Sequence, residues 1–306
     1  MAQRTGTSLP LVPAAAFVLV WSSGYISGPA AVHAAAPFSV LGWRFVLAAV
    51  LAVGLALALR RPSRMDRATL GRVAAVGLVM NGLQFGLMYV AFDFGLGATL
   101  ASLFHALSPV LTALLAAALL GERVSAVQVV GFVVGVAGVL LVLGSDLGHA
   151  GGPVAVLVGC VSMLTLSLGT LGQRWIGAQP DLLWSAAVQF AVSAPPLLVL
   201  GWTTEGAWPV TDGRQALVAV LFLAIVNSIV GLVLLSLLVL RGGSGAAASL
   251  FFLSPPVTAV LAWLVLDETL SPAQLVGLVV AVVGVGAATR TRRPASPLPV
   301  QDVGTQ

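Results

Sequence analysis

The residues best suited to binding chemistry in this sequence are single polar side chains placed inside long apolar runs. A polar group in such a run is costly to bury, so it tends to face another polar group or a bound molecule. Together with neighbouring aromatic residues, the polar groups at the centres of six runs predict a small-molecule binding site midway along the helices. The predicted binding residues are Trp21, Ser22, Tyr25, Asn81, Gln84, His105, Ser108, Ser162, Thr165, Asn227, Phe251 and Ser254.

Each of these residues also has a structural interpretation that the sequence leaves open. Asn81 and Asn227 are compatible with ligand contact or with hydrogen bonds between neighbouring helices. His105 is compatible with binding a ligand or a proton, or with an interhelical hydrogen bond. The aromatic residues form either a wall against an apolar ligand or ordinary packing.

Arg44 is a charged residue expected well inside an apolar run. It follows Pro37 by seven residues, which places it about 10 Å along a helix that rises 1.5 Å per residue. Two interpretations remain open. Its side chain either extends back to the lipid headgroups or points inward and pairs with a substrate carboxylate.

Catalytic and metal chemistry find little support in the sequence. Catalysis needs a nucleophile, a base and an orienting group together, yet His33, His105 and His149 are scattered and no acid accompanies His105. A structural zinc site needs about four ligands, and Cys160 is the only cysteine. No lysine exists to complete a phosphate-binding P-loop. We therefore expect no enzyme, no metal and no cofactor.

The composition indicates that most of the chain lies in a membrane. Of its 306 residues, 59% are hydrophobic and 8% charged, against about 25% charged in soluble domains. A helix needs about 20 apolar residues to cross the hydrocarbon core, and the first run is too long for a cleaved signal peptide. The ten predicted spans are 11–31, 38–59, 70–92, 96–119, 124–143, 152–173, 182–201, 215–240, 243–266 and 272–289.

The arginines predict how these spans are oriented. With the N-terminus in the cytoplasm, nearly all arginines outside the spans are cytoplasmic, and only Arg214 lies outside. This bias explains the net charge of +4 without a nucleic-acid partner. We predict a multi-pass protein of the bacterial inner (plasma) membrane, with a cytoplasmic N-terminus at 1–10 and a disordered cytoplasmic tail at 290–306.

The most specific pattern in the sequence is an internal repeat with an offset of 146 residues, the separation of Ser108 and Ser254. Apolar composition alone would match Val with Leu, but it would not match Asn, Ser-Pro, Glu and Gln without a gap. Each copy holds five spans, an odd number, so the second copy is inverted relative to the first. The matched pairs include Asn81 with Asn227, Pro109 with Pro255, Glu122 with Glu268, Ser125 with Ser271 and Gln128 with Gln274.

Two of the repeated features suggest mechanical roles. Pro109 and Pro255 each remove a backbone N–H in mid-span, which predicts either a flexible kink that shapes a cavity or a static packing kink. Glu122 and Glu268 each follow a helix at a tight turn. We expect each carboxylate to accept N–H groups from the start of the next helix, with a gating role as the alternative.

Two segments resemble the repeats of EamA-type transporters in the drug/metabolite transporter superfamily. They are YVAFDFGLGATLASLFHALSPVLTALLAAALLGERVSAVQVVG and RGGSGAAASLFFLSPPVTAVLAWLVLDETLSPAQLVG. The resemblance implies an all-α membrane fold of ten helices in two inverted five-helix repeats, here 11–143 and 152–289, with both termini inside. It also implies a secondary transporter that exports small metabolites, often amino acids. We expect alternating access at a central site, in a monomer or homodimer within the lipid bilayer.

Other functions fit less well. The small multidrug resistance proteins of the same superfamily rely on a membrane-buried carboxylate in their first helix, but residues 11–31 contain no Asp or Glu. A proton-coupled multidrug exporter therefore remains the alternative to metabolite export. A membrane-embedded enzyme or a receptor is more distant, because neither needs an inverted repeat.

Overall fold

The computed structural model of the protein describes residues 10–144, 151–176, 180–206 and 210–290. Within these ranges the regular structure is helical, apart from an isolated bridge between Ala35 and Val210. The predictions for the N-terminus before residue 10, for His149 and for the tail after Arg290 fall outside the described residues.

The helices follow one another through short connections. The first half contains α1 (Leu11–Ala34), α2 (Pro37–Ala58), α3 (Arg67–Gly77), α4 (Gln84–Asp93), α5 (Ala98–Leu120) and α6 (Ala126–Leu143). The second half contains α7 (Gly152–Gly172), α8 (Leu182–Thr204), α9 (Gly213–Phe222), α10 (Gly231–Ser249), α11 (Ser254–Leu266) and α12 (Pro272–Arg290). Two π-helical stretches, η1 (Leu78–Leu83) and η4 (Leu223–Val230), join α3 to α4 and α9 to α10.

In the described part of the chain, nine helical segments are long and apolar enough to cross a membrane. The predicted span at 243–266 differs, because the helix boundary expected near residue 243 is wrong. There α10 continues to Ser249, a 3₁₀ turn η5 (Leu250–Leu253) follows, and α11 begins at Ser254. Pro255 and Pro256 favour the break, since proline fits the first turn of a helix, whereas in the interior it removes a backbone hydrogen bond.

Side chains that accept the unpaired N–H groups of the first turn fix several helix starts. Ser125 and Gln128 form a capping box at the start of α6, and Ser271 and Gln274 make the equivalent bonds at the start of α12. Asp66 caps α3 by accepting the Thr69 N–H, and hydrogen bonding to Thr69 lowers the pKa of the Asp66 carboxyl.

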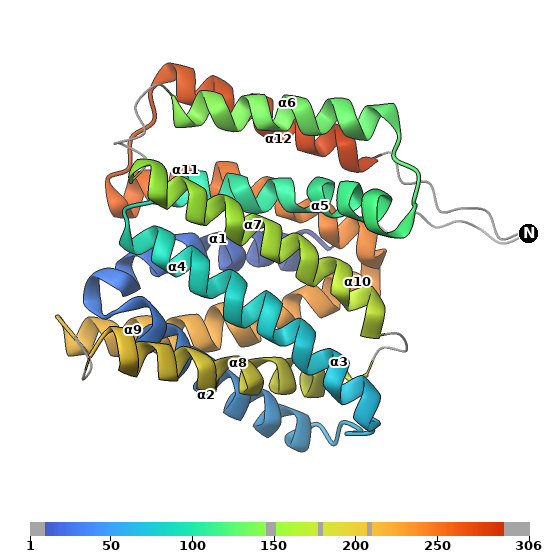
Figure 1. Cartoon of the computed structure of the whole chain (residues 1–306), viewed down its shortest axis with the longest axis vertical. Coiled ribbons are helices and arrows are strands. Elements are labelled where there is room, and N and C mark those ends of the chain that lie inside the picture. Colours follow the sequence, from blue (N-terminus) through green and yellow to red (C-terminus); the bar gives the residue numbers. More distant parts are fainter. Residues whose placement is uncertain (1–9, 145–150, 177–179, 207–209, 291–306) are drawn as a thin grey trace, which may run out of the picture.

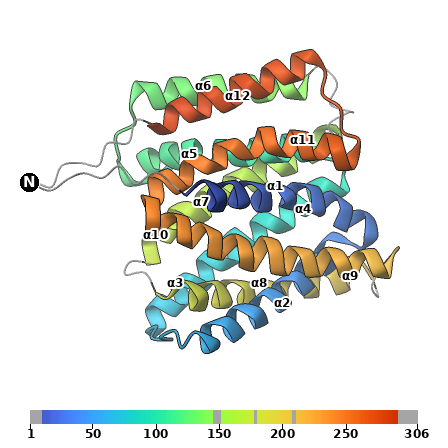
Figure 2. The ribbon, with the colours of Figure 1, turned by 180° about the vertical axis from the view of Figure 1, so that it is seen from behind.

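Equivalent helices of the two halves lie next to each other at both edges of the bundle. Figure 1 shows α6 and α12 together at one edge and α2 and α8 together at the other, and Figure 2 shows the same pairs from behind. The helices α6 and α12 approach closely through small residues, because a Cβ added to Gly138 would collide with the backbone of Ala281. The remaining helices form the interior.

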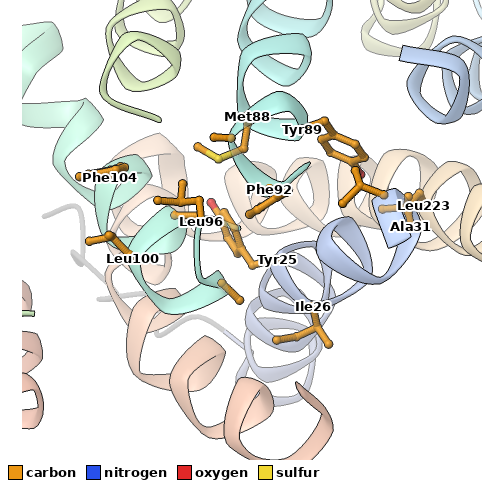
Figure 3. Packing of buried hydrophobic residues seen from close by; sticks show 14 of the residues in the cluster. Tyr25, Ile26, Ala31, Met88, Tyr89, Phe92, Leu96, Leu100, Phe104 and Leu223 are labelled. Atoms are coloured by element: carbon orange, nitrogen blue, oxygen red, sulfur yellow. The ribbon is translucent and has the colours of Figure 1, made fainter. Parts of the chain in front are cut away.

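The interior helices exchange partners between the halves. Helix α1 packs against α10 and α11 of the second half, and α7 packs against α4 and α5 of the first. Many of their buried residues belong to one large apolar core, which includes Tyr25, Met88, Phe92 and Phe104 (Figure 3). The two halves are therefore interlocked, and a site in this core is built by both.

Candidate functional site

A network of four polar side chains crosses the interior from α1 to α7. The Tyr25 hydroxyl lies 2.9 Å from Nδ1 of His105, and the Gln84 amide nitrogen lies 3.0 Å from Nε2 of the same ring. The Gln84 amide also donates to the Ser162 hydroxyl at 3.3 Å, and this hydroxyl donates to the Gln84 backbone carbonyl at 2.9 Å. We call these four residues, Tyr25, Gln84, His105 and Ser162, the polar network.

The hydrogen-bond pattern indicates a protonation state for the His105 ring. The Gln84 amide has two N–H groups, which serve His105 and Ser162 in this amide orientation. Because the first donates to Nε2, the proton of a neutral imidazole lies on Nδ1 and is donated to the Tyr25 oxygen. In this orientation a neutral ring makes a hydrogen bond at each of its nitrogens, and the network can exchange these hydrogen bonds with a small polar ligand.

Arg44 lies inside the bundle and not at its lipid surface. Only 5% of the residue is exposed, which excludes the interpretation that its side chain extends to the headgroups. Its Nε donates to the Ser228 hydroxyl and one Nη to the Tyr89 hydroxyl, both at 3.3 Å. The guanidinium also lies over the ring of Phe85, 4.6 Å from its centroid. The side chains that contact the Arg44 guanidinium are therefore uncharged.

Two serine pairs join helices of opposite halves in equivalent ways. Ser108 of α5 lies 3.0 Å from Ser167 of α7, and Ser254 of α11 lies 3.1 Å from Ser22 of α1, measured between hydroxyl oxygens. All four serines are buried. Their positions in the repeat suggest that they hold the helices together. Ser167 is absent from the predicted set, although it satisfies the same criterion of a polar residue inside an apolar run.

The two predicted asparagines do not meet. Asn81 donates to the Gln189 side-chain oxygen at 3.4 Å, and Asn227 donates to the Val20 carbonyl at 2.6 Å. Both contacts are interhelical hydrogen bonds, as one of the two interpretations expected. Both residues lie in the π-helical stretches η1 and η4, which sequence analysis did not predict. Such stretches occur frequently at functional sites.

The other predicted residues divide between packing and local hydrogen bonds. Trp21 and Phe251 meet edge to face with ring centroids 4.7 Å apart, and Phe17 joins them at 5.2 Å from Phe251. The Thr165 hydroxyl donates to the Ser162 carbonyl within its own helix at 2.8 Å. Phe17 and Phe251 pack with Leu238 and Ala247 in a second apolar cluster, whereas Trp21 packs both against this cluster and against the core that contains Tyr25.

The prolines do not have symmetric effects. Pro109 lies within α5, which remains one helix from Ala98 to Leu120. Pro255, its equivalent in the second half, lies in the first turn of α11 instead. The helix is thus interrupted just before Pro255 and continuous around Pro109, and a functional kink at either proline stays a prediction.

Neither turn carboxylate caps the next helix, which corrects the expectation from the sequence, and only Glu268 caps a helix, one of the other half. Glu268 accepts the N–H groups of Ala98 and Thr99 at the start of α5, at 3.0 and 3.3 Å. Glu122 instead pairs with Arg174 at 2.6 Å. The capping boxes described above occupy the starts of α6 and α12 and make a glutamate unnecessary there.

Glu205, which the sequence analysis did not select, plays the same part as Glu268. It follows α8 and accepts the N–H groups of Phe38 and Ser39 at the start of α2, at 2.7 and 3.0 Å. It also accepts the Ser39 hydroxyl at 2.8 Å. No spacing in the sequence indicates this contact, because it joins residues of different halves.

The residues of the polar network and of the Arg44 site break the internal repeat. At the 146-residue offset, His105 corresponds to Phe251, Gln84 to Val230 and Arg44 to Phe190. By contrast, the duplicated residues described above make interhelical bonds or caps. No group of three His, Cys, Asp or Glu in the described ranges is placed to hold a metal ion.

Comparisons with known proteins agree with this architecture. An uncharacterized transporter of Bacillus subtilis (strain 168), YvbV, is 27% identical over 285 residues, which are 92% of this chain and 91% of that protein. A probable amino-acid metabolite efflux pump of Escherichia coli (strain K12) is 26% identical over 276 residues, 87% of this chain and 90% of that protein. A solved crystal structure at 21% identity has the same fold, with a TM-score of 0.65 over 94% of this chain and 98% of that one.

The family model known as the EamA-like transporter family matches the chain twice, at residues 10–144 and 153–290. The two matches correspond to the two repeats that the 146-residue offset predicts. They confirm the predicted multi-pass, all-helical membrane fold, and they indicate a transporter and not an enzyme. Since the model accounts for both halves of the sequence, the chain belongs to the EamA-like transporter family of the drug/metabolite transporter superfamily.

Proposed function

We propose that this protein is a secondary exporter of small metabolites, amino acids or related compounds, with its substrate site at the polar network. The observation that carries the proposal is the placement of this network. Tyr25, Gln84 and His105 come from the first half and Ser162 from the second, so the network lies where the two halves meet. A site between two inverted halves can be exposed to either side in turn.

The name of one relative supports the substrate class. The protein of Escherichia coli with similarity to 87% of this chain is named a probable amino-acid metabolite efflux pump. Amino acids carry groups that donate and accept hydrogen bonds, and the network offers an amide, an imidazole and two hydroxyls to them.

The hydrogen bonds between the halves supply the parts that alternating access must rearrange. On the side that we predict to face outward, Glu205 and Glu268 hold the starts of α2 and α5. On the predicted cytoplasmic side, Arg174 pairs with Glu122, and Arg72 donates to the Trp175 carbonyl at 3.3 Å. Opening the outward side breaks the contacts of Glu205 and Glu268 and keeps the cytoplasmic contacts. Opening the cytoplasmic side does the reverse. The predicted topology places both termini in the cytoplasm and the protein in the bacterial inner membrane.

The proposal is tested by the metabolites in spent medium. Cells producing the wild-type chain are compared with cells producing a Gln84→Leu/His105→Leu double variant, with equal amounts of protein in the membrane. We expect one compound class to accumulate outside wild-type cells only. The control is Arg64→Gln, which changes an exposed arginine that takes no part in these contacts between the halves and should retain export. If wild-type and double-variant cells release the same metabolites at the same rates, the proposed site or the proposed direction is wrong.

A further inference from the structure

Arg44 is a buried cation that has no anionic partner in the described part of the protein. The residue is 5% exposed, and the ion pairs found in these ranges join Arg61 to Asp181 and Arg174 to Glu122. A charge taken out of water is costly unless it is paired. The guanidinium also stays protonated in proteins. Arg44 therefore carries a positive charge into the bundle without a carboxylate to balance it.

None of the acidic residues of the described ranges forms an ion pair with Arg44. Glu205 contacts the same helix as Arg44, but at the first turn of α2, where it binds Phe38 and Ser39. Arg44 lies five residues beyond Ser39, about 7.5 Å further along the helix. The remaining acids cap helix starts or lie at helix ends and turns: Asp66, Asp93, Glu122, Asp181, Asp212, Asp267 and Glu268.

The contacts of Arg44 hold the guanidinium in place but use little of its bonding capacity. Of its five N–H groups, one donates to Ser228 and one to Tyr89. The Ser228 hydroxyl in turn donates to the Leu223 carbonyl at 3.1 Å, within the π-helical stretch η4, so its oxygen is oriented toward Arg44. A planar guanidinium fixed in this way matches a carboxylate, which accepts two parallel N–H bonds.

Arg44 also lies at the boundary between the halves. Tyr89 and Phe85 belong to the first half and Ser228 to the second. Phe45, beside Arg44, stacks on Phe190 of α8 with ring centroids 5.6 Å apart. A ligand bound to the guanidinium would touch both halves, and the surrounding rings would pack against its apolar part.

We propose that Arg44 binds the carboxylate of the exported substrate, so that the substrate class is small organic acids with an apolar part, amino acids included. The inference rests on the proposed export function and adds a recognition group to it. The carboxylate supplies the negative charge that the bundle lacks at Arg44. Compounds in which this group is neutral leave the cation unbalanced and bind poorly. Tyr89 and Ser228 act as positioning residues for the guanidinium.

The test measures binding by the purified full-length protein in lipid nanodiscs. The probes are the twenty common amino acids and, for each one that raises the thermal unfolding temperature, its carboxamide. We expect at least one amino acid to bind and its carboxamide to bind about tenfold more weakly or worse, since charged hydrogen bonds are lost. Arg44→Gln should lose this preference for the acid, and Arg44→Lys should keep part of it.

Arg64→Gln is the matched control, because it removes an exposed arginine that belongs to neither the proposed site nor the contacts between the halves, and it should bind like the wild type. The inference is overturned if no amino acid binds the wild type, if acid and carboxamide bind equally, or if Arg44→Gln binds the acid as the wild type does. Export of compounds without a carboxylate would overturn it while leaving the exporter proposal intact. Acid-selective binding without export would support the role of Arg44 and contradict the exporter proposal.

Discussion

At the scale of residues, the duplicated polar residues make contacts between helices, whereas the residues of the proposed site are not duplicated. Asn81 and Asn227 are equivalent in the repeat, and each makes an interhelical hydrogen bond. Ser108 and Ser254 are also equivalent, and each binds a serine of the opposite half. His105 has no such equivalent. A substrate near a pseudo-two-fold axis is itself asymmetric, so the residues that recognise it are expected to differ between the copies.

A His105→Phe substitution tests this separation, because phenylalanine is the residue at the equivalent position of the second half. The change removes the 2.9 Å contact with Tyr25 and one partner of the Gln84 amide. We expect transport to fall by about tenfold or more, the loss of one or two buried hydrogen bonds. The measurement is export rate at matched protein levels.

The exposed His33 supplies the control for this experiment. A His33→Phe variant carries the same chemical change outside the polar network and should export at the wild-type rate. Equal export by His105→Phe and wild type would show that the network does not contact the substrate.

Sequence reasoning found most of the polar residues of the interior but not their partners. The depth of Arg44 in α2 follows from its distance to Pro37. The direction of its side chain depends on which face of α2 packs inward, and a helix that is apolar on all sides gives no signal of that face. Tyr89 was overlooked for a related reason, since tyrosine is common at membrane interfaces and in packing. Only the fold brings Arg44, Tyr89 and Ser228 together.

At the scale of elements, the closest helix contact is between α6 and α12. In Gly138→Ala the added Cβ would collide with the backbone of Ala281, and helix backbones cannot move apart locally without cost. We expect a destabilisation of about 1–3 kcal/mol, as for other overpacked sites. The measurement is thermal unfolding of the purified protein in detergent or nanodiscs.

Gly54→Ala in α2 is the control, because no atom lies within 4 Å of the Cβ that it would add. Both substitutions raise helix propensity equally, so only the steric effect differs. A Gly138→Ala variant as stable as Gly54→Ala would mean that α6 and α12 are further apart than described.

The glutamate that caps the start of α5 gives a second prediction at the scale of elements. Glu268→Gln keeps the shape of the side chain but loses the charge and one acceptor for the start of α5. We expect it to lose about 1 kcal/mol of stability, the usual worth of a helix cap. The matched change Glu122→Gln alters an exposed ion pair and should cost no more than about 0.5 kcal/mol. The measurement is thermal unfolding of the two variants, and we expect the lower unfolding temperature for Glu268→Gln. A lower unfolding temperature for Glu122→Gln would contradict the capping role of Glu268.

The sequence predicts the positions of the helices but not their internal irregularities. Apolar length locates the helices, and the Ser-x-x-Gln spacing locates the starts of α6 and α12. The break before α11 was missed because hydropathy does not register that Pro255 and Pro256 favour a first-turn position. The π-helical stretches were missed as well, since one added residue per turn leaves the apolar run intact.

At the scale of the whole molecule, two interlocked halves explain both stability and function. The helices α1 and α7 each pack against the opposite half, so neither half completes the interior alone. The odd number of spans per copy and the 146-residue offset predict this inverted arrangement, and the two family matches cover the same two halves. Which side chains meet between the halves could not be predicted, because no local pattern reports contacts across a repeat.

The central claim is that the protein moves a small metabolite through a site formed by the polar network. Its most direct test is efflux from liposomes that contain the purified protein and are loaded with the compound found in spent medium. We predict saturable efflux for the wild type and loss of efflux for Gln84→Leu, at equal amounts of inserted protein. Wild-type efflux no faster than from empty liposomes, or equal efflux from Gln84→Leu, would contradict the account.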